Sequence, residues 1–260
     1  MNNTVRVALA AAAVVVIGFL GYQLLSGRDV EGFGPTETPQ PTSSLAPSTG
    51  PAIPGLPGTV MSPEMLTPGT YSVRPEIIDA PRVEVTVPAG WTGFGFGISK
   101  NDSMSPPAGV GITFWGGPMY VYEDPCRWES SRPNAPVGPS VDEMVVALSA
   151  QAMRNATAPT DITVDGFAGK AIELTVPADI AFDPENGFVD CDGRLEFRSW
   201  ILEKGLSSYS LQAAPGQHDQ VWIIDVNGTR VIIDASLYEA TSAADMADLQ
   251  AVLESIRFQR

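Results

Sequence analysis

The feature that most limits how this chain can fold is an uncharged apolar run, Val7–Leu25, close to its start. A helix of these nineteen residues would be roughly 28 Å long, close to the hydrocarbon thickness of a bilayer. Arg6 precedes the run, whereas Arg28 beyond it is followed at once by Asp29 and Glu31. This charge bias favours an N-terminus in the cytoplasm. The run therefore predicts a single transmembrane anchor that places the rest of the chain outside the cytoplasm.

A cleaved signal peptide is the alternative interpretation of the same run. Signal peptides usually have an apolar region of about 7–15 residues and small residues around the cleavage site. This run is longer and ends in Tyr22–Leu25, which favours an uncleaved anchor. No cysteine follows closely that could carry a lipid. Both interpretations export the remainder of the chain.

A tract rich in Pro, Ser, Thr and Gly follows the anchor. Of the thirty-nine residues from Gly32 to Thr70, nine are proline. Such a segment buries too little apolar surface to offset the entropy cost of ordering, and proline favours extended geometry. We therefore expect a short cytoplasmic N-terminus (1–6), the anchor (7–25), a disordered tether (26–70) and one folded domain (71–260). Fully extended, the tether would span roughly 120 Å.

The predicted domain is strongly acidic. Residues 71–260 contain 13 basic and 26 acidic side chains. Such a surface repels nucleic acid and anionic lipid headgroups, and it favours cations or basic partners. An acidic surface that only keeps an exported domain soluble is the alternative.

Strand patterns dominate this domain. Val83–Val87 alternates apolar and polar residues and stops at Pro88, as a half-buried strand should. The clearest hairpin joins Val221–Val226 to Thr229–Leu237 through Asn227-Gly228, which suits a type I′ turn. Five further segments show strand patterns: Val110–Trp115, Met119–Tyr122, Ala171–Val176, Leu195–Leu202 and Tyr209–Ala213.

Two helices are predicted. Ser140 and Glu143 have the spacing of a capping box, and a second helix should begin near Thr241 or Ser242, with Asp245 in its first turn. The expected buried stripes are Val141, Met144, Val145, Leu148 and Ala152 in the first helix, and Met246, Leu249, Val252, Leu253 and Ile256 in the second. Together the elements predict an α+β fold, an antiparallel sheet sandwich with two packed helices.

The order of these elements resembles a known group. The motif VTVPAGW at Val85–Trp91, the capped helix, the turn at Asp165–Gly169 and the ending SIRF at Ser255–Phe258 resemble the PsbP-like fold. That group includes bacterial surface lipoproteins and photosynthetic accessory proteins. The resemblance covers about residues 80–260 and implies a non-enzymatic domain that binds a partner or ligand. The chain lacks the lipidated cysteine of the lipoproteins, which its transmembrane helix could replace.

The domain contains two cysteines, Cys126 and Cys191. An oxidising location outside the cytoplasm predicts a disulfide bond between them. Closing a loop of this length would stabilise the fold by roughly 3–4 kcal/mol.

Three residues suggest a ligand site. Trp115 precedes a Gly-Gly-Pro turn, and Trp128 and Arg127 lie beside Cys126. Aromatic side chains with few polar groups suit a small-ligand pocket. The other tryptophans, Trp91, Trp200 and Trp222, lie in or beside strands and are expected in the core.

An acidic cluster gives a second candidate site. Asp183, Glu185, Asp190 and Asp192 lie close together in the sequence and carry the oxygen ligands that calcium prefers. The spacing does not match an EF-hand loop, and a solvated acidic loop is the alternative. Two of these carboxylates could also serve a glycosidase.

Nucleophilic catalysis has little support, because His218 is the single histidine and is expected in a turn. The sequence therefore predicts a membrane-tethered extracytoplasmic domain that binds a small ligand or a protein partner in the cell envelope without catalysis. The alternatives are a structural or assembly factor acting by protein–protein contact, and an envelope hydrolase using paired carboxylates.

Overall fold

The computed structural model describes residues 52–76, 80–100, 108–193, 196–202 and 209–259. The apolar run 7–25 and residues 26–51 of the predicted tether lie outside these ranges, so the anchor stays a prediction. Within the described ranges, no helix combines the length and the apolar character needed to cross a membrane.

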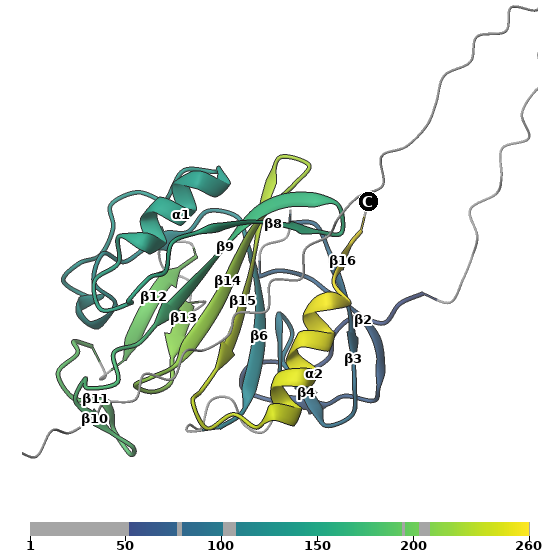
Figure 1. Cartoon of the computed structure of the whole chain (residues 1–260), viewed down its shortest axis with the longest axis horizontal. Coiled ribbons are helices and arrows are strands. Elements are labelled where there is room, and N and C mark those ends of the chain that lie inside the picture. Colours follow the sequence, from purple (N-terminus) through teal and green to yellow (C-terminus); the bar gives the residue numbers. More distant parts are fainter. Residues whose placement is uncertain (1–51, 77–79, 101–107, 194–195, 203–208, 260) are drawn as a thin grey trace, which may run out of the picture. The chain divides into compact units, whose positions relative to one another are not determined.

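An antiparallel sheet of eight strands forms the centre of the domain (Figure 1). In spatial order its strands are β1 (Glu64–Met65), β4 (Trp91–Gly93), β5 (Gly97–Lys100), β6 (Val110–Gly116), β15 (Thr229–Leu237), β14 (His218–Val226), β9 (Phe167–Thr175) and β8 (Thr160–Val164). The predicted hairpin is confirmed: Asn227 and Gly228 have φ angles of 55° and 83°, and β14 and β15 pair without a break. The β8–β9 hairpin turns at Asp165-Gly166, also with positive φ.

A layer of structure covers each face of this sheet. One layer contains α2 (Ala243–Glu254) and a sheet of β16 (Arg257–Phe258), β3 (Val83–Val87) and β2 (Gly69–Val73). The other contains α1 (Val141–Ser149) and a sheet of β13 (Tyr209–Gln212), β12 (Phe197–Ile201) and β7 (Tyr120–Val121). Figure 1 shows the two helices on opposite sides of β14 and β15. Three smaller elements complete the described chain: the 3₁₀ helix η1 (Pro125–Arg127) and the hairpin of β10 (Phe182–Asp183) and β11 (Gly187–Phe188).

The strands of the central sheet are apolar on both faces. On β15, Val231 and Ile233 pack in the core beneath α2, whereas Ile232 between them packs in the core beneath α1. Successive side chains of a strand point to opposite faces, so one strand supplies both cores. The predicted α+β class, with antiparallel sheets and two packed helices, is confirmed.

Both predicted helix starts are confirmed, with one correction to the buried stripes. The Ser140 hydroxyl accepts the N–H of Glu143, and the Glu143 carboxylate accepts the N–H of Ser140; Ser242 caps α2 in the same position. Met246, however, is 44% exposed. The buried place in the first turn of α2 belongs to Asp245, which lies 2.8 Å from Lys100 Nζ on β5. Ala152 is also exposed, because α1 ends at Ser149.

The predicted boundary between tether and domain is wrong. The strand β1 pairs with β4 at the edge of the main sheet, and Leu66 is buried in the core beneath α2. The N–H of Ser72 donates to the carbonyl of Pro54 at 2.8 Å, and the N–H of Leu56 donates back to Ser72 at 3.0 Å. A sequence with few apolar residues can thus be ordered when it adds to an existing sheet edge, where the backbone supplies the contacts. The domain therefore includes residues 54–70.

Three ionisable side chains lie buried between the sheet and the layer that contains α1. Arg154 is 0% exposed, and its Nη2 lies 2.5 Å from Oδ2 of Asp219 on β14. Asp234 on the neighbouring strand β15 faces the same pair. Burial, and next the negative charge of Asp219, raise the pKa of Asp234 well above its usual range, while Arg154 acts in the opposite direction. Asp234 therefore keeps its proton to a higher pH in the folded state than in the unfolded chain.

This proton makes stability depend on pH. An unfolded aspartate titrates near pH 4, so above that pH the folded state holds one proton more than the unfolded state. Stability from this group is therefore lost as the pH rises from about 4 toward the raised pKa. The variant Asp234→Asn has an uncharged side chain of nearly the same shape but no titrating proton. We expect its free energy of unfolding, measured by urea titration, to fall less between pH 4 and pH 8 than that of the wild type.

The matched control is Glu239→Gln, which removes an exposed carboxylate on the loop after β15. Its pH profile should follow the wild type. If Asp234→Asn loses stability over this pH range as steeply as the wild type, the carboxyl of Asp234 does not hold a proton in the folded state.

Candidate functional site

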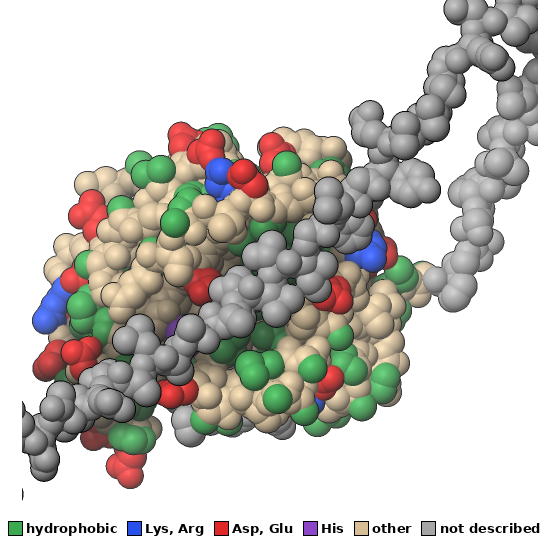
Figure 2. All heavy atoms as spheres, viewed as in Figure 1, with side chains coloured by type: hydrophobic (Ala, Val, Ile, Leu, Met, Phe, Trp, Pro, Cys, Tyr) green, Lys and Arg blue, Asp and Glu red, His purple; other side chains and the backbone are tan. Residues whose placement is uncertain are grey.

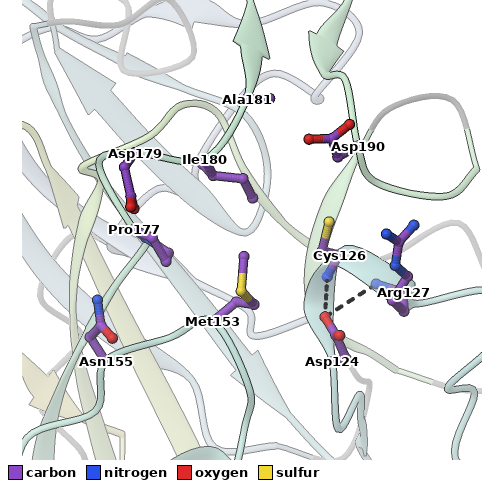
Figure 3. A pocket seen from close by; sticks show the side chains of 10 residues that line it. All are labelled: Asp124, Cys126, Arg127, Met153, Asn155, Pro177, Asp179, Ile180, Ala181 and Asp190. Atoms are coloured by element: carbon purple, nitrogen blue, oxygen red, sulfur yellow. Dashed lines mark hydrogen bonds between the residues drawn. The ribbon is translucent and has the colours of Figure 1, made fainter.

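A pocket of about 580 Å³ opens beside the predicted disulfide (Figure 3). Four segments line it: residues 124–127 around η1, residues 153–155 after α1, residues 177–181 after β9, and Asp190 after β11. Figure 3 shows their side chains arranged around one central space. The four segments are far apart in the sequence, so only the fold brings them together.

The disulfide between Cys126 and Cys191 is confirmed, with a Cα–Cα distance of 4.5 Å. Both cysteines are buried, and they pack with Phe188, Phe197 and other apolar side chains. The N–H of Asp192 also donates to the carbonyl of Cys126 at 2.9 Å. The bond therefore fixes the η1 wall of the pocket against the segment that carries Asp190.

Removal of this bond should loosen the domain. We expect the double variant Cys126→Ala/Cys191→Ala to lose about 2–4 kcal/mol of stability, measured by urea unfolding. A reducing agent serves as the control: it should destabilise the wild type and leave the double variant unchanged. A reductant effect of equal size on both proteins would show that the disulfide is not the source of the stability.

The wall formed by residues 153–155 has an unusual backbone. Met153 and Asn155 have positive φ angles of 60° and 35°, and both line the pocket. Asparagine tolerates this left-handed region, but methionine rarely adopts it. Strain of this kind costs about 1–3 kcal/mol and concentrates at functional sites. Arg154 between them points into the protein and pairs with Asp219.

The pocket is acidic. Its lining includes Asp124, Asp179 and Asp190 but a single cation, Arg127. The Asp124 carboxylate accepts the N–H groups of Cys126 and Arg127 at 2.9 and 3.3 Å. Within the described residues, Asp179 and Asp190 form no ion pair and both are exposed. Their carboxylates are therefore available to a ligand. Figure 2 shows acidic side chains on many parts of the visible face and few basic ones.

Trp115 does not line the pocket, contrary to the sequence prediction. Strand β6 continues through it to Gly116, and the side chain is 2% exposed. Its ring lies 5.0 Å from Phe96 and 5.8 Å from Trp200, measured between centroids, and its Nε1 donates to Thr113 Oγ1 at 2.8 Å. Trp115 is therefore a core residue of the layer beneath α1.

Trp128 does not line the pocket either. The guanidinium of Arg198 lies 3.6 Å from the Trp128 ring and 3.7 Å from the Tyr209 ring, so it is sandwiched between the two. Gly193 packs so closely on Trp128 that a Cβ at this position would collide with the ring. The indole is thus used in a contact within the domain. Of the three predicted binding residues, Arg127 alone lines the pocket.

Three of the four carboxylates of the predicted calcium site have separate positions and contacts. Asp183 closes the β10–β11 turn by accepting the N–H groups of Glu185 and Asn186 at 2.8 and 3.1 Å, and these hydrogen bonds lower the pKa of Asp183. Asp192 accepts from Ser130, whereas Asp190 lines the pocket. In the part of the chain that the structure describes, no three His, Cys, Asp or Glu side chains gather as a metal site would require. The predicted cluster is not formed there.

His218 also differs from its predicted position in a turn. It is the first residue of β14, and its Nδ1 lies 3.2 Å from Thr175 Oγ1. It does not line the pocket.

Sequence reasoning missed Met153 and Asn155 as pocket residues. One local signal was present: α1 is followed by a connection to β8 that contains no glycine. A tight change of direction after a helix usually uses a left-handed glycine, so the positive φ angles had to fall on other residues. Nothing local predicts that this connection meets the disulfide.

Comparison with known proteins gives only weak similarity. No protein-family model and no curated protein matches the chain. Among solved structures, the chain is similar to a protein from Bacteroides thetaiotaomicron VPI-5482, with 8% identity and a TM-score of 0.31, over 75% of this chain and 50% of that one. It is also similar to cyanobacterial PsbP (CyanoP) from Synechocystis sp. PCC 6803, with 13% identity and a TM-score of 0.31, over 75% and 95% of the two chains. Both similarities are weak, and one of the two structures is a PsbP, the group that the sequence motifs resemble.

Proposed function

We propose that this chain is a non-catalytic binding domain whose pocket takes an organic cation, and that residues 7–25 hold it at a membrane with the domain in the cell envelope. The observation that supports binding is the pocket itself, with three carboxylates and one basic side chain beside the disulfide. The apolar run and its flanking charges support the membrane anchor.

The lining favours an amine or guanidinium carried on an apolar chain. Asp179 and Asp190 supply negative charge at the rim, whereas Met153, Pro177 and Ile180 supply apolar surface. The volume of about 580 Å³ lies within the range of small-molecule sites, roughly 300–1,000 Å³. The net charge of −15 would also attract cations from solution. A polyamine, or a lysine or arginine side chain of a partner, has this chemistry.

Isothermal titration with spermidine and cadaverine tests the proposal on the full chain. We expect the double variant Asp179→Asn/Asp190→Asn to bind about tenfold more weakly, or about 1.4 kcal/mol, because two partly exposed charge contacts are lost. Arg127→Gln should bind more tightly, since it removes a like charge from the rim.

The matched control is Glu173→Gln/Glu239→Gln, which removes the same number of exposed carboxylates away from the pocket. Equal weakening in the control would mean that the whole protein's charge, and not the pocket, attracts the cation. Absence of any spermidine or cadaverine binding to the wild type would contradict the proposed ligand class.

A second candidate function is an assembly factor that acts by protein–protein contact. It is favoured by a two-residue turn closed by mutual backbone bonds of Thr59 and Ser62, both 3.0 Å. This turn displays Val60 and Met61, the latter 94% exposed, and Met65 nearby is also exposed. Exposed apolar side chains that lie close together mark contact surfaces in many proteins.

A photo-crosslinker placed at Met61 in the native membrane tests this second function. We expect defined adducts with one partner, and their loss when Val60→Ser is added. Adducts that persist in the variant, or that also form from a probe at exposed Glu173, would contradict a specific contact.

A further inference from the structure

We propose that the buried Asp219 carboxylate is a positioning residue for the pocket: it holds two of its walls together, through Arg154 on one side and Gln217 on the other. The proposal rests on the proposed function only for its effect on ligand affinity. The effect of Asp219 on the position of the two walls can be measured without a ligand.

The first link runs through Arg154. Asp219 Oδ2 accepts from Arg154 Nη2 at 2.5 Å, and both side chains are at most 1% exposed. Arg154 lies between the pocket residues Met153 and Asn155, and its own carbonyl accepts the N–H of Thr175 at 2.8 Å. Its side chain and its backbone therefore both fix the segment 153–155 against the end of β9.

The second link runs through Gln217. Its Nε2 donates to the other oxygen of Asp219, Oδ1, at 2.7 Å. The carbonyl of Gln217 accepts the N–H of Val176 at 3.0 Å, and Val176 directly precedes the pocket residue Pro177. Gln217 is itself held, because its Oε1 accepts the N–H of Ala213 at 2.7 Å. The wall at residues 177–181 is thus tied to the same carboxylate.

The geometry makes Asp219 difficult to replace. Within the described residues, Nε and Nη1 of Arg154 have no hydrogen-bond partner, so the bond to Asp219 is the one hydrogen bond that orients its guanidinium. The backbone on both sides of Arg154 is left-handed, at Met153 and Asn155, a conformation that persists only when surrounding contacts impose it. The two remaining segments, at η1 and at Asp190, are joined separately by the disulfide.

Amide hydrogen exchange of the full chain, resolved by residue with NMR, tests whether Asp219 holds the two walls. Asp219→Asn should speed exchange at Thr175 and Val176 at least tenfold relative to Ile232, a reference amide in the middle of β15. Gln217→Met breaks only the second link, so it should speed exchange at Val176 and leave Thr175 near its wild-type rate. The ratio to Ile232 removes any change in global stability.

The control is Lys100→Met, which breaks the pairs of Lys100 with Asp245 and Asp248 on the other side of the sheet, at 2.8 and 2.6 Å. It should leave the exchange ratios at Thr175 and Val176 unchanged. Unchanged ratios in Asp219→Asn, or an equal increase in the control, would overturn the proposal.

Titration with spermidine then tests the effect on binding. We expect Asp219→Asn to weaken binding about tenfold although Asp219 does not line the pocket, and Lys100→Met to have no effect. Faster exchange with unchanged spermidine affinity would overturn the role of Asp219 in binding. If exchange is faster in Asp219→Asn but the wild type binds neither spermidine nor cadaverine, the positioning role is supported and the proposed function is contradicted.

Discussion

The pairing of β14 with β15 is the interaction on which the rest of this domain depends. The two strands pair over nine residues each, from His218↔Leu237 to Val226↔Thr229. Other layers of the domain cover the two faces of each strand, which is less usual for antiparallel strands than for parallel ones. A slip of one residue would exchange the two cores, since it would move every side chain to the opposite face. The turn at Asn227-Gly228 prevents this slip by fixing the register.

The same hairpin carries the buried carboxylates. Asp219 and Asp234 lie on the face covered by the layer that contains α1, where an unpaired charge would be costly. The structure lowers the cost in two ways, by pairing Asp219 with Arg154 and by raising the pKa of Asp234, which favours its neutral form. A buried ion pair adds little net stability compared with an apolar replacement. Its retention here is consistent with a role in positioning, because Arg154 and Gln217 both lead from Asp219 to the walls of the pocket.

Much of the fold could be predicted from local patterns. The caps at Ser140 and Ser242, the I′ turn and most strands depend on residues that are neighbours in the chain. The predictions were wrong where contacts with distant residues determine the position of a side chain. Trp115 precedes a glycine-rich turn, which suggested exposure, yet β6 extends through it into the core. Met246 matched a helical stripe, yet Asp245 takes the buried position because Lys100 on β5 lies beside it.

The candidate site was less predictable than the fold. The disulfide was predicted because the sequence contains a single pair of cysteines, and Arg127 was named because it lies beside one of them. Met153, Asn155 and Asp179 meet them only through packing, so no spacing in the sequence indicates the pocket.

By itself, the sequence determined the antiparallel α+β class, the central hairpin, both helix starts and the disulfide, because turn geometry, capping and side-chain alternation act over a few residues and two cysteines leave one pairing. Only the tertiary structure decided that residues 54–70 belong to the domain, that Trp115 and Trp128 are used internally, and that four distant segments form an acidic pocket. These features depend on which surfaces meet across the sheet, and such long-range contacts have no local pattern.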